Sequence, residues 1–68
     1  MTIEEIMQVV ISMPYQKVAH QSFTDDEYVY CDKNGQLRDE EGLCLPWNEF
    51  WGLRMKSMPD HWFMTMSV

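Results

Sequence analysis

The first dozen residues carry the periodicity of an amphipathic helix. Apolar side chains recur there at intervals of three and four residues, which places them on one helical face. These positions are Ile3, Ile6, Met7 and Val10. Thr2 and Glu5 have the spacing of a capping box. Pro14 ends the pattern, because the residue before a proline avoids the helical region. The sequence therefore predicts a helix over residues 3–12.

After this segment the pattern changes from helical spacing to short extended runs. Residues 17–20 are a short run that is expected to form a strand. Residues 27–31 are rich in β-branched and aromatic side chains, which is typical of strands. Asn34-Gly35 follows the second run, and this dipeptide is the strongest short signal for a hairpin turn. Residues 36–38 are then expected to form the returning strand of an antiparallel pair.

The second half of the chain predicts a short helix and a last strand. An acidic turn at residues 39–42 precedes Pro46, which suits the start of a helix. Gly52 limits that element to a short helix or turn near residues 47–52. The large and small side chains of residues 61–66 alternate as in a strand. The expected fold is one α+β domain over residues 1–68, with the N-terminal helix packed on a small antiparallel sheet.

The charge balance excludes several classes of partner. The net charge is −6, so direct nucleic-acid binding through neutralised phosphates is not expected. An anionic membrane surface is disfavoured for the same reason, and no apolar run approaches the roughly 18 to 20 residues of a membrane span. The 46% apolar fraction is too high for a disordered acidic tail. The acidic start also lacks the basic region of a signal peptide, which predicts a cytoplasmic protein.

The small size of the chain predicts an oligomer. A domain of this length buries only about 60% of its unfolded surface, and disulfides, metals or oligomerisation usually compensate. Cys31 and Cys44 are expected to stay reduced, because no secretion signal is present. Nine aromatic residues and seven methionines exceed what so small a core needs. Some of them are therefore expected at an interface between identical subunits.

The residue types with catalytic or metal-binding potential have unsuitable spacing. The two histidines and two cysteines lack the short Cys-x-x-Cys or His-x-x-x-His intervals of zinc sites. The triplets Asp25-Asp26-Glu27 and Asp39-Glu40-Glu41 lie in predicted turns, where side chains are rarely desolvated enough for acid–base catalysis. No glycine-rich phosphate loop or nucleophile elbow is present. The sequence predicts a protein with no enzymatic activity, no metal and no cofactor.

Two features remain that fit a binding protein. Between Asp25 and Glu41 lie seven acidic and two basic residues, so a rigid acidic turn is able to imitate a phosphate backbone. Its partner-binding residues are expected to be Asp39, Glu40 and Glu41. The second feature is an aromatic cluster whose members stack on bases in some proteins and fill cores in others. The cluster consists of Trp47, Phe50, Trp51 and Trp62.

A family resemblance favours the aromatic cluster. The relevant motifs, in chain order, are Thr2-Ile3-Glu4-Glu5-Ile6, Lys17-Val18-Ala19-His20 leading to Phe23, Tyr28-Val29-Tyr30, Leu45-Pro46-Trp47 and Asp60-His61-Trp62. Their order along most of the chain resembles the small bacteriophage proteins of the second Thoeris anti-defence type. Those proteins share a starting helix, a Lys-Val-Ala strand leading to an aromatic residue, a Pro-Trp step and a closing strand around a final tryptophan.

The resemblance implies a homo-oligomeric phage protein of the host cytoplasm that sequesters a cyclic nucleotide signal of a bacterial defence system. Aromatic side chains at subunit interfaces would stack on the bases, and a positive group such as Arg54 would lie near a phosphate. The ligand-binding residues expected on this basis are Phe23, Trp47, Asn48, Arg54 and Trp62. The alternative hypothesis is an acidic phage inhibitor that docks on a host protein, as a nucleic-acid mimic, through residues 39–41.

Overall fold

The computed structural model describes residues 1–67 and the side chains of residues 1–65. Two helices and five strands follow each other along the chain. They are α1 (Ile3–Ser12), β1 (Gln16–His20), β2 (Val29–Cys31), β3 (Leu37–Asp39), β4 (Cys44–Leu45), α2 (Trp47–Ser57) and β5 (Trp62–Ser67). The predicted α+β fold with a small antiparallel sheet is confirmed. Neither helix is long and apolar enough to cross a membrane within the described residues.

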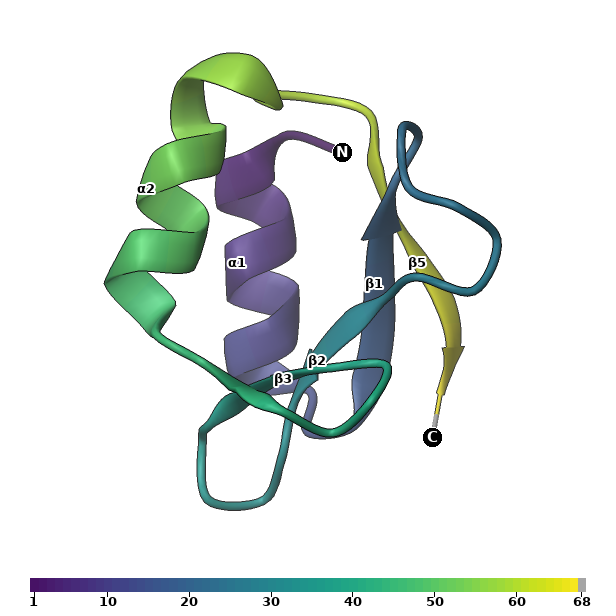
Figure 1. The fold of residues 1–68 in the computed structure, drawn as a ribbon, viewed down its shortest axis with the longest axis vertical. Coiled ribbons are helices and arrows are strands. Elements are labelled where there is room, and N and C mark those ends of the chain that lie inside the picture. Colours follow the sequence, from purple (N-terminus) through teal and green to yellow (C-terminus); the bar gives the residue numbers. More distant parts are fainter. Residues whose placement is uncertain (68) are drawn as a thin grey trace.

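The strands form one antiparallel sheet in the order β4-β3-β2-β1-β5. Both helices lie on the same side of this sheet, and β5 returns from the end of α2 to pair with β1 (Figure 1). A single cluster of buried side chains fills the space between the helices and the sheet. Within residues 1–67 the opposite face of the sheet carries no helix, and its side chains are available to form a surface.

Helix α1 forms as the sequence predicts. The Thr2 hydroxyl accepts a hydrogen bond from the Glu5 backbone N–H at 3.2 Å, and the Glu5 carboxylate accepts one from the Thr2 N–H at 2.8 Å. These two bonds satisfy donors that the helix itself leaves free. Ile3, Ile6 and Val10 are fully buried against the sheet. The helical periodicity of the sequence therefore identifies the part of α1 that enters the core.

The hairpin between β2 and β3 also has the predicted position. Tyr30 pairs with Arg38, and the chain reverses through a turn in which Gly35 has a φ of 79°. The Asp32 carboxylate holds this turn by accepting hydrogen bonds from the N–H groups of Asn34 and Gln36, at 2.9 and 3.0 Å. An acidic side chain in the turn thus takes a structural role.

Helix α2 is longer than the sequence predicts. It continues through the exposed Gly52 to Ser57, because Phe50 and Trp51 bury their rings in the core on one side of it. The Arg54 guanidinium lies 3.9 Å from the centre of the Phe50 ring and donates to the Phe50 carbonyl at 3.0 Å. The tertiary packing of Phe50 and Trp51, together with this contact within the helix, outweighs the low helix propensity of one glycine, which costs about 1 kcal/mol.

The conformation of Gly35 gives a test of the hairpin. We expect Gly35→Val to lower the free energy of unfolding by at least about 1 kcal/mol, because a β-branched residue resists positive φ. Nothing lies within 4 Å of the added Cβ, so this loss measures backbone strain rather than a clash.

Gly52→Ala is the matched control, because that position is helical and equally open. This variant is expected to raise the free energy of unfolding by about 0.5 to 1 kcal/mol. Chemical denaturation measures both variants. Equal effects of the two substitutions would contradict the account.

Candidate functional site

The five residues expected to bind a ligand occupy two separate parts of the molecule. Trp62 is only 1% exposed and belongs to the core, so its ring contacts protein on all sides. Phe23 packs edge-on against Trp62, with 5.5 Å between ring centres, and lines a hollow beside the end of β1. Trp47 lines two other hollows near the β2–β3 hairpin. Asn48 and Arg54 belong to α2, with Trp47.

Trp47 is the best placed of these residues to contact a ligand. Its ring is half-buried and packs edge-on against Trp51 at 5.6 Å, which fixes its position at the start of α2. On one side lies a hollow of about 280 Å³ that Ile11 and Lys33 also line. A second hollow of about 360 Å³ includes Gly35. Trp47 therefore forms the shared wall of two hollows that meet at the hairpin.

The cation beside Trp47 is Lys33, which the sequence did not single out. Lys33 is exposed on the hairpin and lines the same hollow as Trp47. Arg54, the residue expected to meet a phosphate, instead stacks on Phe50 of its own helix. Asn48 is exposed one residue beyond Trp47. Trp47 and a positive group thus line the same hollow, but this group is Lys33 and not the expected Arg54.

The charge of Asp32, next to Lys33, is balanced within the hairpin. Its carboxylate accepts a hydrogen bond from Arg38 Nε at 2.7 Å, and Arg38 Nη1 donates to the Gly42 carbonyl at 2.6 Å. The bond from Arg38, followed by that from the Gln36 amide, lowers the pKa of Asp32 below its ordinary value. Because Asp32 and Arg38 satisfy each other, the charge of Lys33 is the one left to attract an anion at Trp47.

The acidic turn is partly structural as well. The Asp39 carboxylate accepts hydrogen bonds from the N–H groups of Glu41 and Leu43 at 2.9 and 3.0 Å, so it holds the turn together. Glu40 and Glu41 are exposed at its tip. Of the three acids expected to contact a partner, only these two are available without disturbing the turn.

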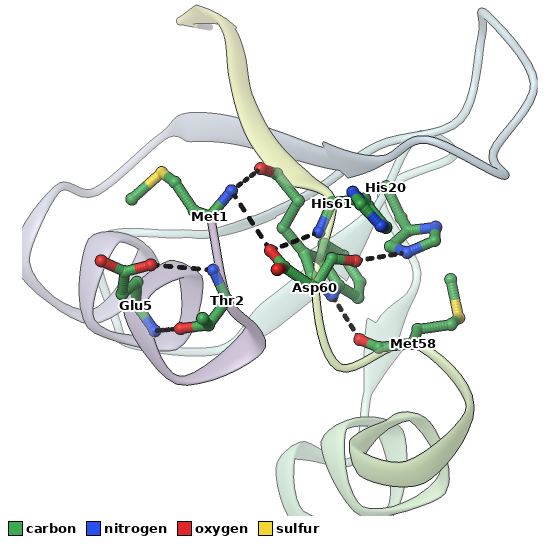
Figure 2. Close-up of polar contacts among 8 residues, drawn as sticks. Met1, Thr2, Glu5, His20, Met58, Asp60 and His61 are labelled. Atoms are coloured by element: carbon green, nitrogen blue, oxygen red, sulfur yellow. Dashed lines mark hydrogen bonds and ion pairs between the residues drawn. The ribbon is translucent and has the colours of Figure 1, made fainter.

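A polar network connects Met1 with Asp60 and His61, just before the start of β5 (Figure 2). The Met1 ammonium donates to the Trp62 carbonyl at 2.7 Å, and the Trp62 indole N–H donates to the Met58 carbonyl at 2.8 Å. His20 Nε2 lies 2.8 Å from the Asp60 carbonyl, and Nδ1 accepts from the Ser22 N–H at 3.0 Å. These bonds place the ring hydrogen on Nε2. His20 and Trp62 therefore serve the fold.

The helix-free face of the sheet carries a row of tyrosines. The Tyr15 and Tyr30 rings stack with centres 5.9 Å apart, and Tyr28 lies 6.1 Å from Tyr30. Tyr15 has a φ of 66°, an uncommon conformation for a residue with a side chain. The alternation of Tyr28 and Tyr30 in the sequence indicates their common face, but no sequence signal places Tyr15 beside them.

The cysteines and other metal-ligating residues do not form a metal site among the described residues. Both cysteines are free, as expected. Cys31 is buried, and burial followed by the charge of Asp32 raises the pKa of its thiol. Cys44 is exposed, and its thiol lies 2.8 Å from the Gln36 side-chain oxygen.

Comparison with known proteins gives no relative. No protein family matches the chain, and neither the curated proteins nor the solved structures contain a significant match. The functional argument therefore rests on the residues and their geometry.

The balance of charge in the hairpin predicts a pH-dependent stability. Because the pKa of Asp32 is lowered in the folded protein, its ionised form stabilises the fold above the unfolded pKa of about 4. That stabilisation is lost as the pH falls through the lower folded pKa. Asp32→Asn is therefore expected to be less stable than the parent protein at pH 7, and the gap should narrow progressively below about pH 4.

Urea unfolding over this pH range measures the effect, with the exposed Asp26→Asn as the control. A gap between parent and Asp32→Asn that stays constant with pH would refute the role of the carboxylate.

Proposed function

We propose that this chain is a non-enzymatic phage protein that sequesters a cyclic nucleotide signal of a host defence system. The observation that carries the proposal is the placement of Trp47 between two hollows, with Lys33 lining one of them. An indole face stacks on any base, and an ammonium group attracts a phosphate. The order of motifs along the sequence, which resembles that of anti-defence proteins, supports the same function.

The net charge of −6 restricts where a phosphate is able to bind. Asp25 and Glu27 line the hollow that contains Phe23, and their carboxylates repel an anion. The hollow at Trp47 is lined by one carboxylate, Asp32, together with Lys33. Asp32 is paired with Arg38, and Lys33 is exposed. The local charges therefore favour the Trp47 side over the Phe23 side for a nucleotide.

The size of the two hollows favours a site completed by a second subunit. Their volumes of about 280 and 360 Å³ lie at the lower end of the range for small-molecule sites. Ile11 lines the first hollow and is 58% exposed, although it is large and apolar. A second copy that covers Ile11 would bury this side chain and enclose a nucleotide against Trp47. This arrangement agrees with the homo-oligomer that the composition suggests.

The oligomer gives the first test of this proposal. Light scattering at micromolar concentration is expected to give a mass that is a multiple of the 8.2 kDa chain. Ile11→Glu should lower this mass, because it places a charge in the apolar contact. Gln8→Glu adds the same charge at an exposed position of the same helix and should leave the mass unchanged. A parent protein with the mass of one chain would rule out the oligomer.

The ligand gives the second test. If Trp47 stacks on a base, Trp47→Ala is expected to weaken cyclic nucleotide binding by about 1 to 3 kcal/mol, and Trp47→Phe should weaken it less. Lys33→Ala should also weaken binding, whereas Arg54→Ala should affect it only through stability. Calorimetric titration with a panel of cyclic nucleotides measures these effects. Circular dichroism controls for folding.

A second candidate function is docking of the acidic turn on a basic host protein. It is favoured by the exposure of Glu40 and Glu41 at the tip of a turn that Asp39 holds rigid. Two neighbouring carboxylates on such a turn are able to imitate the phosphates of a nucleic acid. Glu40→Lys with Glu41→Lys would abolish such docking and leave nucleotide binding nearly unchanged. Charge reversal at Asp39 is unsuitable as a test, because it would also disrupt the turn.

A further inference from the structure

The hollow beside the end of β1 has a different chemistry from the hollows at Trp47. It has a volume of about 320 Å³. Three aromatic side chains and two carboxylates take part in its lining. They are Phe23, Tyr28, Phe63, Asp25 and Glu27.

The aromatic walls of this hollow are held in place by the fold. Phe23 packs on both Trp62 and His20, with ring centres 5.5 and 6.2 Å away. Phe63 is paired with Ala19 across the sheet, and its side chain is 45% exposed. Its phenyl ring is therefore a large apolar group at the border of the hollow, where a ligand is able to contact it. The rings therefore offer preformed faces and edges to a ligand.

The charges of the hollow select a cation. Asp25 and Glu27 line it, while no lysine or arginine does. One carboxylate oxygen of Glu27 accepts a hydrogen bond from the Thr24 N–H at 3.0 Å, which anchors this side chain in its loop. Asp25 is exposed. A phosphate or carboxylate ligand would be repelled here, whereas a positive group would meet both carboxylates and aromatic rings.

The chain itself shows that a cation is attracted to this wall. The Lys17 ammonium lies 4.3 Å from the centre of the Tyr28 ring, within the range of cation–π contacts. Lys17 extends from β1 on the same face of the sheet, but it is not among the residues that line the hollow. Tyr28 also lines the hollow, so the ring that Lys17 contacts borders the space that a cation from outside would enter.

We propose that this hollow binds an arginine side chain from a basic segment of a partner protein. The guanidinium group is planar and stacks on aromatic rings, and its fork of N–H groups matches carboxylates. A volume of about 320 Å³ is suited to one long side chain and its neighbours. The site is separate from Trp47, so it is independent of the proposed nucleotide function.

A peptide titration tests this inference. The probe is a short glycine–serine peptide that contains several arginines, and the control peptide carries citrulline, an uncharged arginine isostere, at the same positions. Nuclear magnetic resonance titration of the whole protein at low salt measures both. We expect the arginine peptide to shift the amide signals of residues 23–28 and of Phe63, and the citrulline peptide to bind about tenfold more weakly or worse.

Two double variants with the same change in net charge distinguish binding of the peptide at the hollow from its general attraction to an acidic protein. Asp25→Asn with Glu27→Gln should reduce the affinity for the arginine peptide about tenfold, and the glutamine keeps an oxygen for the Thr24 N–H. Glu40→Gln with Glu41→Gln changes two exposed acids outside the hollow and should reduce it much less. Equal losses in the two variants, equal binding of the two peptides, or no binding of the arginine peptide would overturn the proposal.

Discussion

Trp62 of β5 contacts three other parts of the chain, namely the N-terminus, the end of β1 with the turn after it, and α2. Its ring packs on Trp51 of α2 at 5.4 Å, on His20 of β1 at 5.1 Å and on Phe23 at 5.5 Å. Its backbone exchanges two hydrogen bonds with Met1, at 2.7 and 3.0 Å. A 68-residue chain has one small core, so burying an indole of this size contributes a large share of the apolar stabilisation. The position of α2, and with it Trp47, depends on this packing.

The same packing determines which aromatic side chains remain for function. Trp47, Trp51 and Trp62 form a continuous series of ring contacts from the start of α2 to the sheet. Trp51 and Trp62 are each 1% exposed, so only the first ring of the series reaches the surface. This arrangement lowers the stability of the fold to some extent, because the Trp51 indole N–H is buried without an acceptor among the described residues. A binding role for a tryptophan therefore falls to Trp47.

Local signals in the sequence predict most of the fold and less of the site. The capping box at Thr2 and the Asn34-Gly35 turn act over a few residues, so the sequence alone places α1 and the hairpin correctly. The continuation of α2 through Gly52 depends on tertiary contacts of Phe50 and Trp51, which no local pattern reveals. The sequence also names the wrong cation for the Trp47 hollow, Arg54 in place of Lys33, for the same reason. Lys33 lies beside Trp47 only because the hairpin and α2 meet in space, and no local pattern reveals this contact.

The most direct test of the central claim is to map where a nucleotide contacts the protein. Nuclear magnetic resonance titration with the tightest-binding cyclic nucleotide reports on each amide and on the three tryptophan indole N–H groups separately. The account predicts the largest shifts at the Trp47 indole and at the amides of residues 33–35, with little change at residues 24–28. Shifts centred on residues 23–28, or no shift with any cyclic nucleotide, would contradict it.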